Sequence, residues 1–429
     1  MIKFSKIKIL AFAIAGLVAP LSASAAPVTD LTKSCKSLVN PNLELQKAPI
    51  RGMPEKVYKR QTRALEQMAA GNYTEAIAQL QRIFDNTSDN YIKAVVSMNL
   101  ASAWAQQNNY DKSLPHFDNA LTYGEGNLQF DQLQAVRLNT ASLSYSVGKK
   151  DEAIRHAKTW LAKSNKEDPK PYVLIAVINA EDGKYREAIC PAWNAVRVQK
   201  KPKKQYHNML LISHYELGDL PGSSKILKEM VTHFPEEKSY WRQLSSLYLS
   251  MDLVKESLAV MEMFYLMGGF ETENDYKTLS ALFAYQEIPY RSAEILEEGM
   301  DKGLVKPEVK NWKSIAANYR VSKETDKAIV AYGKTAEVDK DGEEFVTQAE
   351  LYLEKDKYRD SIKALDKALS KGVKDKGRVL FTKGSAQANL GQCKSAIRTL
   401  EDATKYKRWR PRANAWIAYV KDREKNDKC

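Results

Sequence analysis

A short phrase that returns about every 35 residues constrains this chain more than any other feature. It reads Gly-Asn-Tyr-Thr-Glu-Ala-Ile at 71–77, Gly-Lys-Lys-Asp-Glu-Ala-Ile at 148–154 and Gly-Lys-Tyr-Arg-Glu-Ala-Ile at 183–189. Weaker copies surround Asn109, Asp356 and Gly391. A fixed period of this length indicates one structural unit repeated in tandem, because each unit covers the apolar face of its neighbour.

The chemistry of the phrase predicts a pair of antiparallel helices, here named helix A and helix B. The Gly or Asn ends helix A, because these residues adopt the left-handed conformation at low cost. The small residue near the start of helix B lets the two helices approach closely. Upstream of the phrase, apolar and small residues recur at helical spacing, as in Trp241, Leu244, Ser245 and Tyr248.

With this phrase and spacing, the chain resembles the tetratricopeptide repeat family from about Val57 to Arg408. The resemblance implies an all-α fold, a right-handed superhelical solenoid of about ten antiparallel helix pairs, and a binding role rather than catalysis. Two places depart from the pattern. Asp252 and Glu287 replace the loop Gly of the sixth and seventh units, and residues 123–130 lengthen the second unit. The expected units begin near Val57, Ala94, Gln134, Pro169, Lys204, Lys238, Glu273, Val309, Gly342 and Gly377.

The two ends of the repeat region, residues 54–408, differ in composition from the repeats. Residues 26–53 contain several prolines and no helical period, which predicts an extended lead-in strapped along the first repeats. Residues 409–429 predict a C-terminal capping helix and tail, because a stack of repeats leaves an apolar face at its last helix. The residues expected to cover the tenth unit are Ala415, Trp416, Ala418, Tyr419 and Val420.

Residues 1–25 have the pattern of a cleaved secretory signal peptide. Lys3, Lys6 and Lys8 precede a short apolar run at 9–19, and Ala23-Ser24-Ala25 supplies the small residues of a cleavage site. The alternative is an N-terminal membrane anchor, which a run this short does not favour, because a span needs about 20 residues. We therefore expect export to an oxidising compartment, most simply a bacterial periplasm.

The chain is basic, with a formal net charge of +13, or +10 without the three lysines of the expected signal peptide. The excess is spread along the chain. It fits a partner of acidic character, or at most a peripheral contact with an anionic membrane face. Export and the lack of any nucleic-acid-binding motif argue against a nucleic acid partner. The basic stretches 200–204 and 405–412 are interpreted as solvated junctions between repeats.

Four cysteines remain after the expected cleavage, and they allow three pairings. Cys393 begins a helix B and Cys429 ends the capping helix, so antiparallel packing brings these two together. Cys35 and Cys190 are then left to pair, which would pin the lead-in across the first four repeats. The alternative is that some or all of the four stay reduced and buried.

The sequence contains no recognisable catalytic constellation. Its five histidines fall in no zinc-binding spacing, and there is no nucleophile elbow, Walker loop or dinucleotide-binding glycine pattern. His207 and His214 fall at packing positions of a helix A, so a core role is favoured over metal binding. We therefore expect neither an enzyme, nor a cofactor, nor a metal site.

The family resemblance implies that helices A line a concave groove in which partner peptides lie. Basic and amide side chains at the position after the Trp-like core residue would form a carboxylate clamp for an acidic or C-terminal peptide. The alternative is a solvated face of a Lys-rich protein. The candidate partner-binding residues are Asn208, Tyr215, Arg242, Lys277, Tyr285, Lys313 and Arg320.

These observations predict a periplasmic scaffold or adaptor that holds partner proteins of the cell envelope. The layout of signal peptide, about ten repeats and terminal Cys resembles periplasmic tetratricopeptide proteins that accompany TonB–ExbB–ExbD systems. That resemblance implies a role in TonB-dependent energy transduction and uptake. The alternatives are an envelope-biogenesis regulator, binding peptidoglycan enzymes or outer-membrane assembly factors, and a peptidase that uses the repeats for docking.

Overall fold

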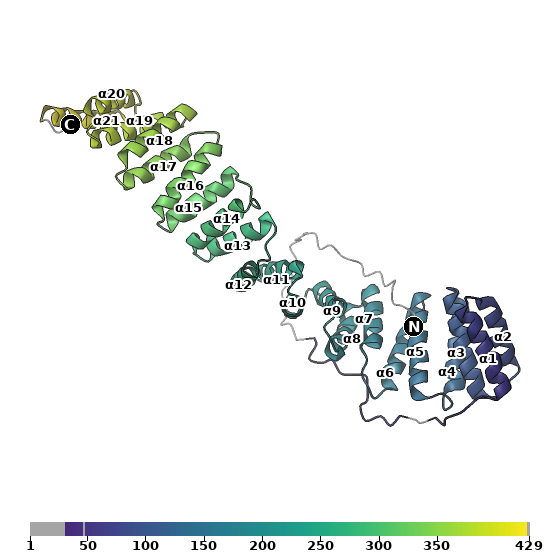
Figure 1. Ribbon diagram of the computed structural model, residues 1–429. Coiled ribbons are helices and arrows are strands. Elements are labelled where there is room, and N and C mark those ends of the chain that lie inside the picture. The colour runs from purple at the N-terminus through teal and green to yellow at the C-terminus, as the bar shows by residue number, and fades with distance from the viewer. Residues whose placement is uncertain (1–30, 46–47, 427–429) are drawn as a thin grey trace. The chain divides into compact units, whose positions relative to one another are not determined.

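The computed structural model describes residues 31–45 and 48–426 (Figure 1). Within these ranges the chain forms 21 helices and no strand. It divides into two units, Met1–Pro235 and Glu236–Cys429, and each is described separately below. The signal peptide predicted at 1–25 lies outside the described residues.

Unit 1 is a stack of five antiparallel helix pairs in which each helix packs on the next along the chain. Its helices are α1 (Glu55–Ala69), α2 (Tyr73–Asp85), α3 (Asn90–Gln106), α4 (Tyr110–Gly124), α5 (Phe130–Ser146), α6 (Lys150–Ala162), α7 (Pro169–Glu181), α8 (Tyr185–Val198), α9 (Lys204–Glu216) and α10 (Leu220–His233).

Unit 2 contains five further pairs and one additional C-terminal helix. Its helices are α11 (Lys238–Ser250), α12 (Val254–Leu266), α13 (Glu273–Tyr285), α14 (Pro289–Asp301), α15 (Val309–Val321), α16 (Thr325–Val338), α17 (Glu343–Glu354), α18 (Tyr358–Lys371), α19 (Lys376–Asn389), α20 (Cys393–Thr404) and α21 (Arg410–Lys425). The predicted all-α fold of ten helix pairs followed by a C-terminal helix is confirmed.

The predicted starts of the second and third pairs were one helical turn late. These pairs begin at Asn90 and Phe130 rather than near Ala94 and Gln134. The reason is capping. The Asp89 carboxylate accepts hydrogen bonds from the first backbone N–H groups of α3, and Gln129 forms a capping box at the start of α5.

Every loop from a helix A to its helix B contains one residue with a positive φ. In unit 1 these residues are Gly71, Asn108, Gly148, Gly183 and Gly218; in unit 2 they are Asp252, Glu287, Lys323, Asp356 and Gly391. The substitution of Asp252 and Glu287 for glycine therefore preserves the turn instead of changing it. Their φ is 58°, a left-handed value that a residue with a Cβ adopts at some energetic cost.

The fourth residue of every helix B is Ala or Ser and is buried, as the sequence phrase predicts. At Ser113 and Ser257 the hydroxyl is satisfied across the helix pair. Ser113 donates to the Ala101 carbonyl at 2.6 Å, and the Ser257 and Ser245 hydroxyls lie 2.8 Å apart. A larger side chain here would separate the two helices of the pair.

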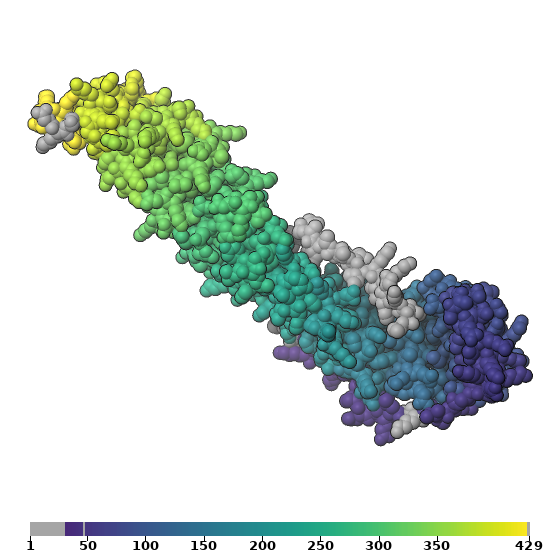
Figure 2. Space-filling view, in the orientation of Figure 1, coloured from purple at the N-terminus to yellow at the C-terminus, as the bar shows by residue number. Residues whose placement is uncertain are grey.

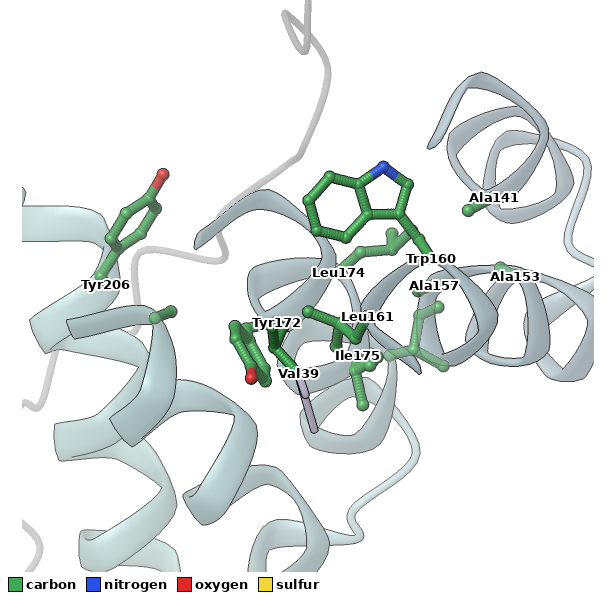
Figure 3. Close-up of a cluster of buried hydrophobic side chains, with 12 residues drawn as sticks. Val39, Ala141, Ala153, Ala157, Trp160, Leu161, Tyr172, Leu174, Ile175 and Tyr206 are labelled. Carbon is green, nitrogen blue, oxygen red and sulfur yellow. The ribbon is translucent and has the colours of Figure 1, made fainter. Parts of the chain in front are cut away.

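The residues before α1 form an extended segment that lies along unit 1, here named the N-terminal strap (residues 31–45 and 48–53; Figure 2). Its backbone is held by side chains of the repeats. Asn194 of α8 donates to the Lys36 carbonyl at 3.0 Å, and the Leu38 N–H donates to the Tyr172 hydroxyl of α7 at 3.1 Å. Val39 is buried in the core cluster that contains Tyr172 (Figure 3).

The strap continues toward the first repeat along the edge formed by the loops from each helix B to the next helix A. Asn165, between α6 and α7, donates to the Leu43 carbonyl, and Gln129, before α5, donates to the Ala48 carbonyl. Arg51 then forms an ion pair with Asp89 before α3 at 2.8 Å. Four successive repeats therefore hold one extended segment.

A disulfide between Cys35 and Cys190 fixes the far end of this strap to α8. The two residues are 155 positions apart, so the bond closes a loop around most of unit 1. The other expected pairing, Cys393 with Cys429, stays a prediction because Cys429 lies outside the described residues. Cys393 itself is buried at the start of α20.

Helix α21 covers the last pair of unit 2, but through a different face from the one expected. Ala413 and Val420 are buried against the Ala396 and Leu400 side chains of α20, and Trp416 packs at the margin of this cluster. Ala415, Ala418 and Tyr419 are exposed. The prediction that these three cover the tenth unit was wrong, because the apolar residues at helical spacing are Ala413, Trp416, Ile417 and Val420.

Candidate functional site

The seven predicted partner-binding residues all lie on helices A, but they divide between the two units. Asn208 and Tyr215 belong to α9 in unit 1. The other five belong to three successive helices A of unit 2: Arg242 on α11, Lys277 and Tyr285 on α13, and Lys313 and Arg320 on α15.

Arg242 is held by a carboxylate of the neighbouring repeat. Its guanidinium donates two hydrogen bonds to Asp275 of α13, at 2.7 and 2.9 Å. Asp275 is 1% exposed and also accepts the backbone N–H groups of Glu271 and Thr272. Burial alone would raise the pKa of Asp275, but these hydrogen bonds leave its pKa below the ordinary value.

The two predicted lysines are also paired with carboxylates. Lys313 contacts Asp339 at 2.9 Å and Glu344 at 3.1 Å, and these carboxylates raise the pKa of Lys313. Lys277 pairs with Glu273 one turn earlier on α13. An acidic peptide would have to displace the chain's own carboxylates to reach these three cations.

Tyr285 and Arg320 are oriented to solvent instead. The Tyr285 side chain is 69% exposed, and Arg320 is exposed without an ion-pair partner among the described residues. Both lie near the end of a helix A, beside the loop to helix B. This edge of unit 2 is therefore open to contact with a partner, whereas Arg242, Lys277 and Lys313 are already held in ion pairs.

Large apolar side chains are exposed along this same edge, on three successive repeats. Val321 is 71% exposed at the end of α15, and Leu253 and Ile288 occupy the position just before α12 and α14. In unit 1 the residue just before each helix B is polar instead: Asn72, Asn109, Lys149, Lys184 and Asp219. We name this set the apolar edge: Leu249, Leu253, Tyr285, Ile288 and Val321.

A cleft of about 160 Å³ lies between α11 and α13, next to the apolar edge. Its lining includes Leu249, Ser246 and Thr278 together with the Arg242–Asp275 pair. The cleft therefore combines an apolar wall with a fixed ion pair, a combination suited to one side chain of a bound segment rather than to a small-molecule substrate.

Sequence reasoning missed four members of the apolar edge. The signal was present at Leu253 and Ile288, which are apolar where the other eight repeats carry a polar residue before helix B. A single apolar residue in a loop is easily read as part of the core. The repeats must first be aligned with one another before such residues can be seen to form one exposed apolar surface.

The described residues contain no group of three His, Cys, Asp or Glu side chains arranged as metal ligands. His207 and His214 are buried in unit 1, as expected for packing positions. The His214 ring lies 2.7 Å from the Asp219 carboxylate, which also caps α10. None of the described helices has the length and apolar character needed to cross a membrane.

Comparison with known families gives a direct match to the repeat pattern. The tetratricopeptide repeat model matches residues 62–127, which span α1 to α4. The chain therefore contains tetratricopeptide repeats. A second model, that of anaphase-promoting complex subunit 5, matches residues 351–410. No curated protein matches the chain.

Several solved structures of tetratricopeptide repeat proteins are similar to parts of the chain. One from Parabacteroides merdae shares 15% identity over 62% of this chain and 99% of its own length, with a TM-score of 0.37. The C-terminal part of one from Cytophaga hutchinsonii shares 13% identity over 65% of this chain and 95% of its own, also at 0.37. YrrB, described as having an unusual peptide-binding site, shares 15% identity over 44% and 94%, at 0.30.

Proposed function

We propose that this tetratricopeptide repeat protein is a scaffold of the bacterial periplasm that holds an extended or helical segment of a partner protein on the apolar edge of unit 2. The observation that carries the proposal is the exposure of five large apolar side chains on three successive repeats, four of them in two pairs at matching positions. Isolated exposed apolar residues are ordinary, but a row of them is costly in water unless something covers it.

The partner segment proposed here is mainly apolar, with an acidic residue at one end. Arg320 lies next to Val321 and supplies a cation that no carboxylate of the described residues pairs with. Arg242, Lys277 and Lys313 contribute less, because breaking their pairs with buried or half-buried carboxylates would leave uncompensated charge. Asn208 and Tyr215 form a separate candidate contact in unit 1.

The Cys35–Cys190 disulfide supports export from the cytosol. Disulfides persist in oxidising compartments and are rare where thiol reductants are abundant. This agrees with the signal peptide proposed for residues 1–25. The periplasm is the compartment that combines both features most simply.

For the partner, we propose a component of TonB-dependent energy transduction and uptake. The support is the layout of the chain: the proposed signal peptide followed by about ten repeats. The second candidate is a factor of envelope biogenesis, such as a peptidoglycan enzyme or an outer-membrane assembly protein. Both are proteins, and both are consistent with a scaffold that uses no cofactor.

The proposal is tested by crosslinking and affinity recovery from intact cells, followed by identification of the partner. The Tyr285→Asp/Val321→Asp double variant places charge in the apolar edge. The matched control is Gln106→Asp/Ser146→Asp, which changes exposed residues at the same register of two repeats in unit 1. Thermal unfolding of all three proteins verifies that they are folded.

We expect the native protein and the control to recover the same partner and the edge variant to lose it. Recovery of inner-membrane energy-transduction proteins would support the TonB role, whereas recovery of cell-wall or assembly proteins would support the alternative. Equal recovery by the edge variant and the native protein would refute the apolar edge as the binding surface.

A further inference from the structure

The loop between α20 and α21 and the first turn of α21 together carry five cationic side chains within eight residues. We name Lys405, Lys407, Arg408, Arg410 and Arg412 the basic loop. All five are exposed. The sequence alone suggests a solvated junction, but the contacts around the loop point to a built surface.

A buried tryptophan fixes the conformation of the basic loop. Trp409 is 8% exposed, and its indole N–H donates to both carboxylate oxygens of Asp375 at 2.9 and 3.0 Å. Its ring stacks on Phe381 with centroids 5.3 Å apart. The close approach requires Gly377, since a Cβ there would come within 2.7 Å of the Trp409 ring. The flanking cations are therefore presented on a rigid turn.

The basic loop gathers within eight residues several cations that have no ion-pair partner among the described residues. Elsewhere, cations such as Arg242, Lys313 and Arg378 contact carboxylates of adjacent helices. The described residues give Lys407, Arg410 and Arg412 no ion-pair partner. Lys405 and Arg408 do contact Asp402 and Asp375, but both cations remain mostly exposed.

The neighbourhood of the loop adds positive potential instead of neutralising it. Arg410 and Arg412 begin α21, a helix of 16 residues with no acidic residue in its first turn. The N-terminal end of a helix is electropositive, and an acidic residue in the first turn would normally complement it. Among the described residues, the five cations form ion pairs with two carboxylates, Asp402 and Asp375, and Asp375 also accepts the Trp409 indole N–H.

Aromatic side chains continue this surface along α21. Arg412 and Tyr419 are exposed on one side of α21, and the half-buried Trp416 lies between them at the edge of the core cluster. The rings of Trp416 and Tyr419 contact each other, and Tyr419 is 52% exposed. Trp and Tyr are favoured at the boundary between lipid headgroups and acyl chains, whereas an acidic peptide has no need of them.

We propose that the basic loop and the outer face of α21 dock unit 2 on an anionic membrane surface, by contact with lipid phosphates. Guanidinium groups bind phosphate oxygens through two parallel hydrogen bonds, and three of the five cations are arginines. The docking uses a different surface from the apolar edge, so a partner and a membrane can be bound together.

The test is co-sedimentation of the full-length protein with vesicles of phosphatidylcholine, with and without phosphatidylglycerol. The Lys407→Glu/Arg410→Glu/Arg412→Glu variant reverses the three unpaired charges. The control, Lys255→Glu/Lys306→Glu/Lys340→Glu, makes the same change in net charge at exposed lysines elsewhere in unit 2. Tyr419→Ser tests the aromatic contribution in a variant that keeps every charge.

We expect binding only to anionic vesicles, weakened by salt and reduced at least about a hundredfold in the loop variant, since each basic residue near a surface contributes substantially to binding. The control should lose much less, and Tyr419→Ser should bind several-fold more weakly. Equal binding by the loop variant and the control would overturn the proposal. Failure of the native protein to bind anionic vesicles, with tight binding of poly-glutamate instead, would overturn it in favour of an acidic protein partner.

Discussion

Unit 1 and unit 2 are built from the same helix pair, but they differ in what covers them. The N-terminal strap lies along the loop edge of unit 1, hydrogen-bonded by four repeats and fixed by a disulfide. Unit 2 has no such segment among the described residues, and eleven large apolar side chains are exposed on it against five on unit 1. The repeat therefore sets the fold of both units, and the uncovered surface of unit 2 is the one that we propose for binding.

The units also differ in the residues that turn helix A into helix B. Unit 1 uses Gly at four of its five left-handed positions, whereas unit 2 uses Asp, Glu or Lys at four of five. All ten residues adopt a similar left-handed φ, so unit 2 stores a small strain that unit 1 avoids. Unit 1 also contains all five histidines of the chain. These contrasts can be separated experimentally.

The largest expected difference comes from the disulfide. In the Cys35→Ser/Cys190→Ser variant, unit 1 should lose about 4–5 kcal/mol of unfolding free energy, because the bond closes a very long loop. Hydrogen exchange across a denaturant series should show this loss in α7 and α8 and none in α13 and α14. An equal loss of unfolding free energy in both units would show that the disulfide does not stabilise unit 1 selectively.

Breaking the Arg242–Asp275 pair should have the next largest effect, confined to unit 2. Asp275→Ala should cost about 2–3 kcal/mol, because it leaves Arg242 and two backbone N–H groups without their acceptor. Asp301→Ala, an exposed acid of the same unit, should change stability by less than about 0.5 kcal/mol. Equal effects of the two variants, measured by chemical denaturation, would mean that the pair is only a surface contact.

Mild acid should act on unit 1 before unit 2. Burial lowers the pKa of His116 and His156 below the ordinary value, so the unfolded state takes up more protons as the pH falls through about 6.5. Unit 1 should therefore lose stability between pH 7 and pH 5. This should appear as faster exchange in α4 and α6, after correction for the intrinsic rate.

Unit 2 should respond only at lower pH. The pKa of Asp339 is held down mainly by its hydrogen bond from Lys313, and the same sign applies to Asp275. Such carboxylates stabilise the fold above their ordinary pKa near 4, and that stability is lost as the pH falls toward the lowered value. Equal destabilisation of the two units at pH 5.5 would contradict this assignment.

The smallest effects should come from exchanging the loop residues between the units. Lys323→Gly should stabilise unit 2 by about 0.5–1 kcal/mol, because glycine adopts the left-handed conformation without strain. Gly148→Ala should destabilise unit 1 by about 1–2 kcal/mol, although the space around it is open. Thermal unfolding of both variants shows whether each substitution raises or lowers stability. An increase in stability for Gly148→Ala would refute the strain argument.

Most of the fold followed from the sequence because its rules are local. The loop residue, the small residue of helix B and the apolar stripe each act within one repeat, so ten helix pairs could be predicted. The errors arose where a local cap moved a helix start, as at Asp89, and where one face of α21 was chosen over another. The predicted Cys35–Cys190 pairing depended on the strap following the repeats, which it does.

The candidate site was less predictable because its chemistry is decided between repeats. Arg242 and Asp275 are 33 residues apart, and nothing in either local sequence shows that they meet. From the sequence, the cation after the Trp-like residue was therefore expected to be free, whereas in the structure it is paired. The exposure of Leu253 and Ile288 likewise depends on how neighbouring loops are covered, which a periodic pattern does not show.

The most direct test of the contrast between the units places a photo-crosslinking amino acid at position 285 in unit 2 and, separately, at the matched position 146 in unit 1. If unit 2 holds the partner on its apolar edge, irradiation of intact cells should give a specific crosslinked species from position 285 that Val321→Asp abolishes, and none from position 146. A crosslinked partner from position 146 alone would contradict the account.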